Sequence, residues 1–392
     1  MKYDICIFTS THCANDTRVF GKQITSFLEA GYSVLYYTNH CGSTNKPLEL
    51  IDSAYSERLK VIYNSGFRIE NRIGRFLRSL SMFFWISNKC RMYHFHDPDL
   101  IFCGFLLRLA GRKVIYDVHE DYIATFSEKP YLSPIARRVI SNSYRMLEAM
   151  MCKWYTAIVT ATPAIRESYI RRGFKRVETI HNFPYSDELL SNLKDEKPGT
   201  RKNLLYVGVI TEIRGFTNLV LALEKANVTT PLSLILAGPI LPESYALTLS
   251  KMKGWRYVHY LGPISRMQMR EELGKAKFGV CLFKPMKNHL EAMPNKIFEY
   301  MSAGLPVLCS NFELWKSLVL DNGVGMVCDP MDIDSISDAL VSFSNLPETT
   351  LETMGEKGKL AIQEKYCWDT EKEKLLELYK SFGVVPEAEK VD

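Results

Sequence analysis

The sequence offers no segment that would carry the protein into or across a membrane. Residues 1–4 lead straight into the strand-like run 5–8, without the basic start and apolar core of a secretory signal peptide. No apolar run reaches the roughly 18–20 residues that a membrane-spanning helix needs, and the run at 101–109 is interrupted by Arg108. We therefore expect a cytoplasmic protein.

Cysteine pairs and glycine-rich loops are missing where common cofactor and metal sites would need them. The ten cysteines include no C-x-x-C pair, so the sequence favours buried reduced thiols over a zinc site or a disulfide framework. The loop 9–18 contains no glycine, although the G-x-G-x-x-G fingerprint of NAD and FAD enzymes belongs in such a loop. We expect no cofactor. A cap on the helix that follows explains Asp16 in this loop as well as an acceptor or phosphate contact does.

Charge of one sign is also modest. A net charge of +5, with 46% hydrophobic and 24% charged residues, is typical of a globular protein and too low for a nucleic-acid binder. Basic residues do gather among aromatic ones in the stretch 68–91, and Arg137, Arg138 and Arg145 share one expected helix. The basic residues of the stretch 68–91 are Arg68, Arg72, Arg75, Arg78, Lys89 and Arg91. Two interpretations stay open, which are peripheral contact with an anionic membrane and an ordinary surface helix with its aromatics in the core.

Short apolar runs alternate with longer amphipathic ones along the whole chain. Strands are expected at 3–9, 33–38, 60–64, 92–96, 113–118, 157–161, 177–181, 203–209, 232–237, 258–261, 278–283, 306–310 and 325–328. The expected helices include 18–30, 99–110, 134–152 and 370–382. Strands and helices that alternate in this way predict an α/β protein with parallel sheets covered on both faces.

The break between the halves is the polar stretch 192–202, which contains Pro198 and Gly199 and is interpreted as a linker. We expect two Rossmann-like domains, residues 1–192 and residues 203–367. The last helix, in 368–392, would pack back on the first domain.

The segment 289–306 follows the expected strand 278–283 and is the best candidate for a binding site. Pro294 suits the first turn of a helix, where its missing N–H costs nothing, and Gly304 would end that helix. The N–H groups of residues 295–297 would then face an anion such as a diphosphate. Glu299 is placed to accept hydrogen bonds from ribose hydroxyls, or simply complements the helix dipole.

A second segment, 205–216, runs from a strand through Gly208 to Arg214 and Gly215 at an expected helix start. Glycine lets the backbone come close to a phosphate, and Arg214 can offer a two-pronged contact to its oxygens. The alternative interpretation is a capped surface loop.

These motifs carry a family resemblance. Glu291 and Glu299 form an E-x7-E spacing, and the run PNKIFEYMSAGLPV resembles the signature of GT4-type retaining glycosyltransferases of the GT-B fold, of the polysaccharide and lipopolysaccharide biosynthesis type. The resemblance implies that residues 1–192 form the acceptor-side domain and residues 203–367 the nucleotide-sugar-binding domain. It implies that Glu299 holds the donor ribose. It also implies that Glu291 contacts the donor sugar, with help from backbone N–H groups of residues 292–296, among them that of Asn295.

The same resemblance assigns the diphosphate to the turn at Gly208, Arg214 and Gly215. The family pattern G-R-x-x-x-x-K-G has an arginine where this sequence has Val209, and Arg214 stands in the place of the lysine. Lys296 is the candidate for the missing cation.

His119 follows the expected strand 113–118 beside acidic residues. Taken alone, such a histidine is more often structural than catalytic, but the resemblance places a histidine here in the cleft, hydrogen-bonded to the donor sugar. The run of His94, His96, Asp97 and Asp99 invites a metal site or a D-x-D motif. No further ligand is evident in the sequence, and Asp97 before Pro98 is interpreted as a helix cap, so no metal is expected.

The resemblance predicts transfer of a sugar from a nucleoside-diphosphate sugar, UDP-linked or alternatively GDP-linked, to a hydroxyl of a glycan or lipid-linked acceptor. Retention of configuration follows from the resemblance alone, and no metal is needed if cationic side chains neutralise the leaving group. Two other functions remain open: a sugar-nucleotide 2-epimerase of the same fold, and a non-catalytic nucleotide-binding assembly protein. The expected location is the cytoplasm, peripherally at the inner face of the membrane.

Overall fold

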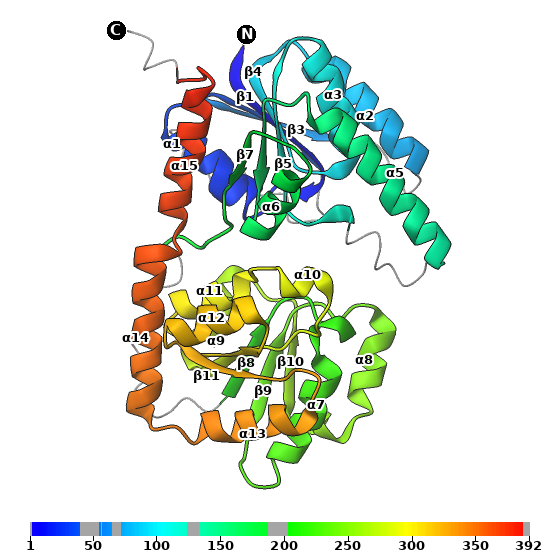
Figure 1. Ribbon diagram of the computed structural model, residues 1–392. Coiled ribbons are helices and arrows are strands. Elements are labelled where there is room, and N and C mark those ends of the chain that lie inside the picture. Colours follow the sequence, from blue (N-terminus) through cyan, green and yellow to red (C-terminus); the bar gives the residue numbers. More distant parts are fainter. Residues whose placement is uncertain are drawn as a thin grey trace. The chain divides into compact units, whose positions relative to one another are not determined.

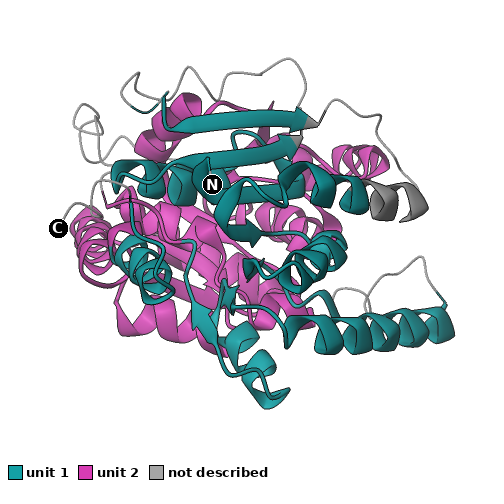
Figure 2. Ribbon diagram, turned by 90° about the horizontal axis from the view of Figure 1, so that it is seen from above, with its two compact units in different colours: residues 1–182, 370–392 teal, residues 183–369 magenta. Residues whose placement is uncertain are grey.

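The computed structural model describes residues 2–39, 55, 57–64, 72–123, 133–186 and 203–386. The expected linker 192–202, Arg68 and the side chains of Arg72, Arg75 and Arg78 lie outside this description. The chain divides into two compact units (Figure 2), unit 1 with Met1–Asn182 and Thr370–Asp392 and unit 2 with Phe183–Asp369. Each unit is described by itself.

Unit 1 is built on a parallel sheet with the strand order β3-β2-β1-β4-β5-β6-β7 (Figure 1). All seven strands coincide with expected ones, and the apolar runs of the central strands are buried on both faces. Their bounds are β1 Tyr3–Cys13, β2 Val34–Asn39, β3 Leu59–Asn64, β4 Cys90–Phe95, β5 Lys113–Val118, β6 Ala157–Thr160 and β7 Val177–Thr179.

Helices cover both faces of this sheet. A shared core holds α2, α3, α5 and α6 against one face. On the other face, Phe27 of α1 and Tyr379 of α15 pack ring to ring at 4.5 Å. The helices are η1 Val19–Ile24 (a π-helix), α1 Thr25–Glu29, α2 Arg72–Ile86, η4 Pro98–Leu100, α3 Ile101–Leu109, α5 Pro134–Cys152, α6 Pro163–Arg171 and α15 Trp368–Ser381.

Unit 2 repeats the plan with the parallel order β10-β9-β8-β11-β12-β13. The strands again fall where the apolar runs predicted them: β8 Asn203–Val207, β9 Ser233–Ala237, β10 Val258–Gly262, β11 Ala276–Cys281, β12 Val307–Ser310 and β13 Gly325–Cys328. The helices are η6 Glu212–Arg214, α7 Phe216–Ala226, α8 Glu243–Ser250, η7 Lys253–Tyr257, α9 Arg266–Lys275, α10 Lys287–Leu290, α11 Asn295–Ser302, α12 Glu313–Asp321, α13 Ile333–Ser344 and α14 Glu348–Lys365. The expected α/β class with two Rossmann-like sheets is confirmed.

The cysteines depart from expectation at one position. Eight of them in the described ranges are buried free thiols, as predicted. Cys13, at the end of β1, is disulfide-bonded instead. Spacing along the chain gave no sign of this bond, because a disulfide depends on two cysteines meeting in space. Over the parts of the chain that the structure describes, none of the helices has the length and apolar character needed to cross a membrane.

Candidate functional site

The start of α11 lies at the carboxyl edge of the unit 2 sheet, where ligands of open α/β sheets bind. Pro294 is the N-cap, with extended φ and ψ of −71° and 126°, so it precedes the helix and does not occupy the first turn as predicted. The loop before it is anchored by the indole of buried Trp315, which donates to the carbonyl of Ala292 at 2.8 Å. The N–H of Ile297 is donated to the carbonyl of Pro294 at 3.1 Å. The N–H of Ile297 is therefore already bonded within the chain. The predicted anion contact stays a prediction for the N–H groups of Asn295 and Lys296.

Glu299 lies one turn further along α11 and is half-buried. Its carboxylate accepts a hydrogen bond of 2.8 Å from the guanidinium of Arg266, the first residue of α9. Ser265 and Gln268 form a capping box that fixes where α9 begins, and therefore where Arg266 stands. Arg266 was not predicted as a site residue, because 33 residues separate it from Glu299.

Gly208 and Lys296 are brought together, although they lie on different elements. Gly208 follows β8 with φ of 142°, a conformation that side chains disfavour, and a Cβ there would collide with the Lys296 side chain. The Lys296 amine also lies 5.6 Å from the centre of the Tyr206 ring. Burial lowers the pKa of Lys296, and Glu299 acts in the opposite direction. The result is a cation held directly above a glycine that leaves room for it.

Arg214 reaches the same tyrosine from η6. Its guanidinium donates to the carbonyl oxygen of Val209 at 2.9 Å and to the hydroxyl of Tyr206 at 3.2 Å. It also lies 5.2 Å from the centre of the Phe283 ring. Val209, where the family pattern has an arginine, therefore contributes a backbone acceptor that orients Arg214. Tyr206 connects the two cations, and sequence spacing alone did not suggest that role.

The turn after Arg214 requires glycine. Gly215 is left-handed with φ of 76°, and a Cβ there would strike the carbonyl oxygen of Leu282. The backbone of α7 therefore begins close to the end of β11. Glu291 and Asn295 stand on either side of Pro294, and both are exposed. The predicted donor-side residues thus all lie in unit 2, and Gly208, Arg214 and Lys296 gather around Tyr206.

At the carboxyl edge of unit 1, histidines from neighbouring strand ends surround one buried carboxylate. Arg18 binds Asp117 through two nitrogens, the closest contact being 2.9 Å. The Nε2 of His94 lies 3.6 Å and the Nδ1 of His96 lies 3.5 Å from the same carboxylate. His119 is partly exposed, and its Nε2 stands 3.1 Å from the Nδ1 of His96. One of these two nitrogens must carry the proton that joins them.

The electrostatics of this cluster follow from burial and one fixed cation. Burial by itself would raise the pKa of Asp117, but Arg18 and the neighbouring histidines hold it well below the usual range. Burial also lowers the pKa of His94, and lowers that of His96 further because His94 lies beside it. Asp117 is therefore a carboxylate, while His94 and His96 are neutral hydrogen-bonding groups. Through its bond to His96, the ring of His119 is set on the edge of a rigid network.

His12 is a further residue at this edge that sequence reasoning missed. Its Nδ1 lies 3.0 Å from Asp16, its Nε2 lies 3.7 Å from Asp97, and its ring centre is 4.9 Å from that of His119. Burial opposes its protonation, yet the two carboxylates raise the pKa of His12 above its ordinary value. Burial would raise the pKa of Asp16, but the bond from His12 lowers it to about 2. Asp16 also accepts from the N–H groups of Arg18 and Val19, as expected of a residue that caps the helix.

Asp97 occupies the N-cap position of η4 with Pro98 in the first turn, as predicted, but its side chain makes no capping hydrogen bond there. It accepts instead from the hydroxyls of Thr9 and Thr11 and from the N–H of Ser10, which ties the end of β1 to the end of β4. Its function in the fold is therefore to hold two neighbouring strand ends together.

A third possible metal ligand does join the histidines, contrary to the sequence interpretation. His94, His96 and Asp117 place one ligand atom each within 4.8 Å of one another, which is a donor set that zinc accepts. Two features oppose a divalent cation there. Arg18 already supplies the positive charge that Asp117 needs, and Gln23 donates to the same carboxylate at 2.6 Å.

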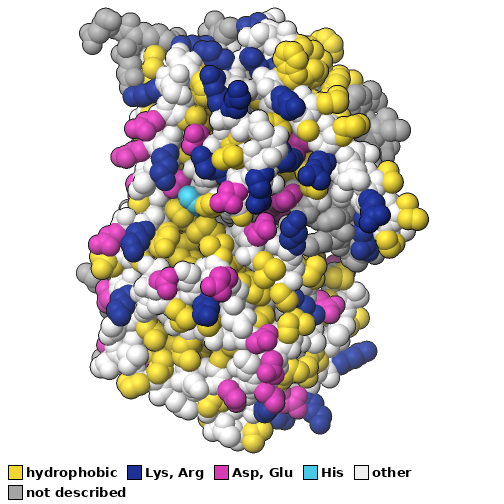
Figure 3. Space-filling view, viewed as in Figure 1, with side chains coloured by type: hydrophobic (Ala, Val, Ile, Leu, Met, Phe, Trp, Pro, Cys, Tyr) yellow, Lys and Arg dark blue, Asp and Glu magenta, His cyan; other side chains and the backbone are white. Residues whose placement is uncertain are grey.

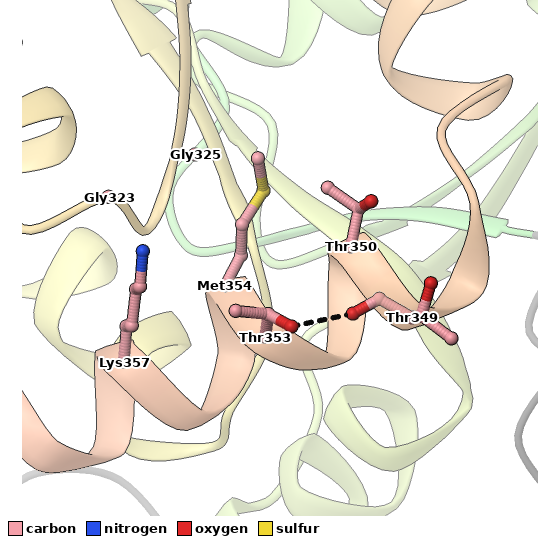
Figure 4. Close-up of a pocket in the computed structure, with 7 residues that line it drawn as sticks. All are labelled: Gly323, Gly325, Thr349, Thr350, Thr353, Met354 and Lys357. Carbon is pink, nitrogen blue, oxygen red and sulfur yellow. Dashed lines mark hydrogen bonds between the residues drawn. The ribbon is translucent and has the colours of Figure 1, made fainter.

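A pocket of about 390 Å³ lies elsewhere in unit 2 (Figure 4). Its lining comes from α14 and from the turn before β13, and consists of Gly323, Gly325, Thr349, Thr350, Thr353, Met354 and Lys357. This is the amino end of β13, whereas the site described above lies at the carboxyl edge. The pocket therefore takes no part in that site.

Comparisons with known proteins agree with this fold. The family model described as Glycosyl transferases group 1 matches residues 191–361, and the one described as Glycosyltransferase Family 4 matches residues 22–183. The chain is a GT4-type glycosyltransferase of the GT-B fold. A comparison with curated proteins finds no match.

Solved structures support the fold of this glycosyltransferase over nearly its whole length. A sucrose-phosphate synthase from Thermosynechococcus elongatus aligns with a TM-score of 0.71 at 15% identity, covering 97% of this chain and 99% of its own. Anabaena HepE in complex with UDP and glucose aligns with a TM-score of 0.70 at 15% identity, covering 97% and 100%. A UDP-forming trehalose-phosphate synthase from Burkholderia xenovorans aligns with a TM-score of 0.68 at 14% identity, covering 98% of this chain and 100% of its own.

Proposed function

We propose that this glycosyltransferase moves a sugar from a UDP-sugar to a hydroxyl of a glycan or lipid-linked acceptor, in polysaccharide assembly at the inner face of the membrane. The observation that carries the proposal is the pair of cations around Tyr206. Arg214 and Lys296 both contact this residue, next to the start of α11. The HepE structure with UDP and glucose supports UDP as the nucleotide, and GDP is the alternative that the first experiment separates.

The pair would act on the leaving group. As the glycosidic bond breaks, negative charge grows on the diphosphate, and Arg214 and Lys296 would stabilise it together with the N–H groups of Asn295 and Lys296. The hydrogen bonds described for Arg214 go to neutral oxygens, so its charge stays available for phosphate. One preorganised contact of this kind contributes about 3–4 kcal/mol to the transition state.

The remaining donor contacts follow from the same edge of the sheet. Glu299 would accept hydrogen bonds from the ribose hydroxyls, taking ribose in place of, or alongside, Arg266. Glu291 and the backbone of the loop that Trp315 anchors would contact the sugar. Gly208 and Gly215 would let the diphosphate approach the backbone, because no Cβ projects from either.

In unit 1 we assign His119 to the donor sugar as a hydrogen-bonding group. Its bond to neutral His96 gives the ring a fixed orientation. The groups that orient it are buried, and Arg18 balances the charge of Asp117 beside them. A rigid, neutral partner of this kind suits a positioning role better than that of a nucleophile.

We propose that the reaction proceeds with retention and without a metal ion. The acceptor hydroxyl would attack on the face from which the diphosphate departs, and the departing phosphate oxygen would take the acceptor proton. The carbon–oxygen bond to the diphosphate breaks as the bond to the acceptor oxygen forms. Arg214 and Lys296 supply the positive charge that a divalent cation supplies in other enzymes.

Two measurements test the proposal. Calorimetric titration with UDP and with GDP should show binding, tighter for UDP, and a radiolabelled UDP-sugar should deliver its label to a glycan or lipid-linked acceptor. The anomeric configuration of the product is then read by NMR. Donor binding without transfer to any such acceptor would refute the activity, and an inverted product would refute front-face attack.

A further inference from the structure

Helix α5 has apolar side chains on the side that faces away from its own domain. Ile135, Val139, Met146 and Met150 recur at intervals of four and seven residues, which places them on one side of the helix axis, and Trp154 follows just after the helix ends at Cys152. All five are exposed, with Ile135 and Met146 at 78% and 66%. Met151 and Cys152 lie on the opposite, buried side. An ordinary surface helix has its polar residues where α5 has this row, which we call the outer row.

The charged side chains that α5 and its C-cap expose have one sign. Arg138, Arg145 and Lys153 are exposed beside it. The only acid of α5 is Glu148, which is buried and paired with Arg172 and therefore adds no negative charge to the outer side. Every charged side chain that α5 exposes is therefore a cation, and the uncharged polar residues Asn142 and Ser143 are exposed as well.

The surface continues onto neighbouring helices. Trp154, which ends the outer row, packs edge-on against Phe105 of α3 at 6.3 Å. At the end of α2, Phe84 and Trp85 are 76% and 64% exposed, and Lys89 lies 5.4 Å from the Trp85 ring. Figure 3 shows hydrophobic and basic side chains next to one another along the margin where α2 and α5 lie.

We propose that the outer row of α5 binds the surface of an anionic lipid bilayer. Apolar side chains would enter the boundary between headgroups and acyl chains, while Arg138, Arg145 and Lys153 meet the lipid phosphates. The large exposed tryptophans suit the same layer, because an indole combines an apolar ring with a polar N–H. The inference rests on the proposed function in one respect, since a lipid-linked acceptor would bring the enzyme to such a surface.

The cations beside the outer row favour a bilayer over a second copy of the chain as the partner. A symmetric contact between two outer rows would bring the same cations face to face without an acid to pair them, which disfavours association. An anionic bilayer offers phosphates to every cation at once.

The test is flotation of the full chain with vesicles. Vesicles of phosphatidylglycerol mixed with phosphatidylcholine should bind the protein, and vesicles of phosphatidylcholine alone should bind it far less. The double variant Met146→Glu, Met150→Glu should lower the affinity at least about tenfold, because each glutamate replaces apolar contact with a charge that the surface repels. Arg145→Gln should lower it about fivefold, the fold-change that corresponds to ~1 kcal/mol for one cation at the surface.

A matched control comes from unit 2. Leu247 of α8 and Leu360 of α14 are 66% and 53% exposed on helices, close to the 66% and 58% of Met146 and Met150. Leu247→Glu with Leu360→Glu should leave flotation unchanged. A thermal shift with UDP shows that every variant is folded and separates this proposal from the donor site.

Equal binding to both kinds of vesicle, or equal loss in both double variants, would overturn the proposal. A lipid-free chain that sediments as a dimer, and as a monomer after Met146→Glu with Met150→Glu, would assign the outer row to a second copy instead. Flotation that fails while UDP still binds refutes only the membrane surface. If the wild type does not bind UDP, the proposed donor site is refuted, and the flotation result still tests the membrane surface.

Discussion

Replacement of Arg214 by alanine tests the leaving-group role most directly. In the free protein the side chain makes hydrogen bonds of 2.9 Å to Val209 and 3.2 Å to Tyr206. The Tyr206 hydroxyl keeps its own bond of 3.0 Å to Val209 after the change, so no buried hydroxyl is left without a partner. The cost to folding should therefore stay near ~1–2 kcal/mol. The loss of one transition-state contact of ~3–4 kcal/mol should lower kcat by about 10²–10³.

The assay is initial-rate transfer at saturating UDP-sugar, with thermal unfolding measured in parallel. Arg256 provides a matched control, because it donates to the Tyr257 hydroxyl at 2.6 Å and lies 4.7 Å from that ring's centre. It stands before β10, at the amino edge of the sheet. Arg256→Ala should leave kcat unchanged. An unaltered rate in Arg214→Ala, or the same loss in both variants, would refute the reasoning.

Three further predictions concern the donor carboxylate, pH and metal ions. Glu299→Ala should weaken UDP binding by about 10- to 100-fold in calorimetry, which is the loss expected for hydrogen bonds to a charged group. Arg266→Ala keeps that carboxylate and should weaken UDP binding far less. Similar losses in the two variants would contradict the ribose role. The raised pKa of His12 means that its ion pairs stabilise the fold fully below about pH 6.5 and lose effect as the pH rises through the folded value, so the Tm advantage of the wild type over His12→Gln should shrink above that pH. An advantage that grows with pH would show that the sign is wrong. Chelation with EDTA should leave the transfer rate unchanged, and a rate that falls and returns with added divalent cation would refute metal independence.

Local pattern was enough for the elements of the fold. The central strands appear where their apolar runs are buried on both faces, whereas the edge strands β3 and β10 form with side chains that are largely half-buried or exposed. The helices end where expected because Gly31, Gly111 and Gly304 adopt left-handed backbone at their ends. The helix that carries Glu299 was also predicted from the sequence, since a helix start after a strand depends on residues near one another in the chain. The position of Pro294 was wrong by one place, which is the usual precision of a helix boundary.

The contacts that complete the site were decided only by the tertiary structure. Arg266 meets Glu299, and Asp117 meets His94, because parallel strands bring their carboxyl ends to one edge whatever the distance along the chain. The sequence by itself determined the strands, the helix ends and the class of reaction, all of which follow from local pattern and one motif. Only folding determined which side chains form ion pairs, and that the side of α5 with Glu148, Met151 and Cys152 is buried while its apolar outer row stays exposed, because burial depends on what packs against the helix.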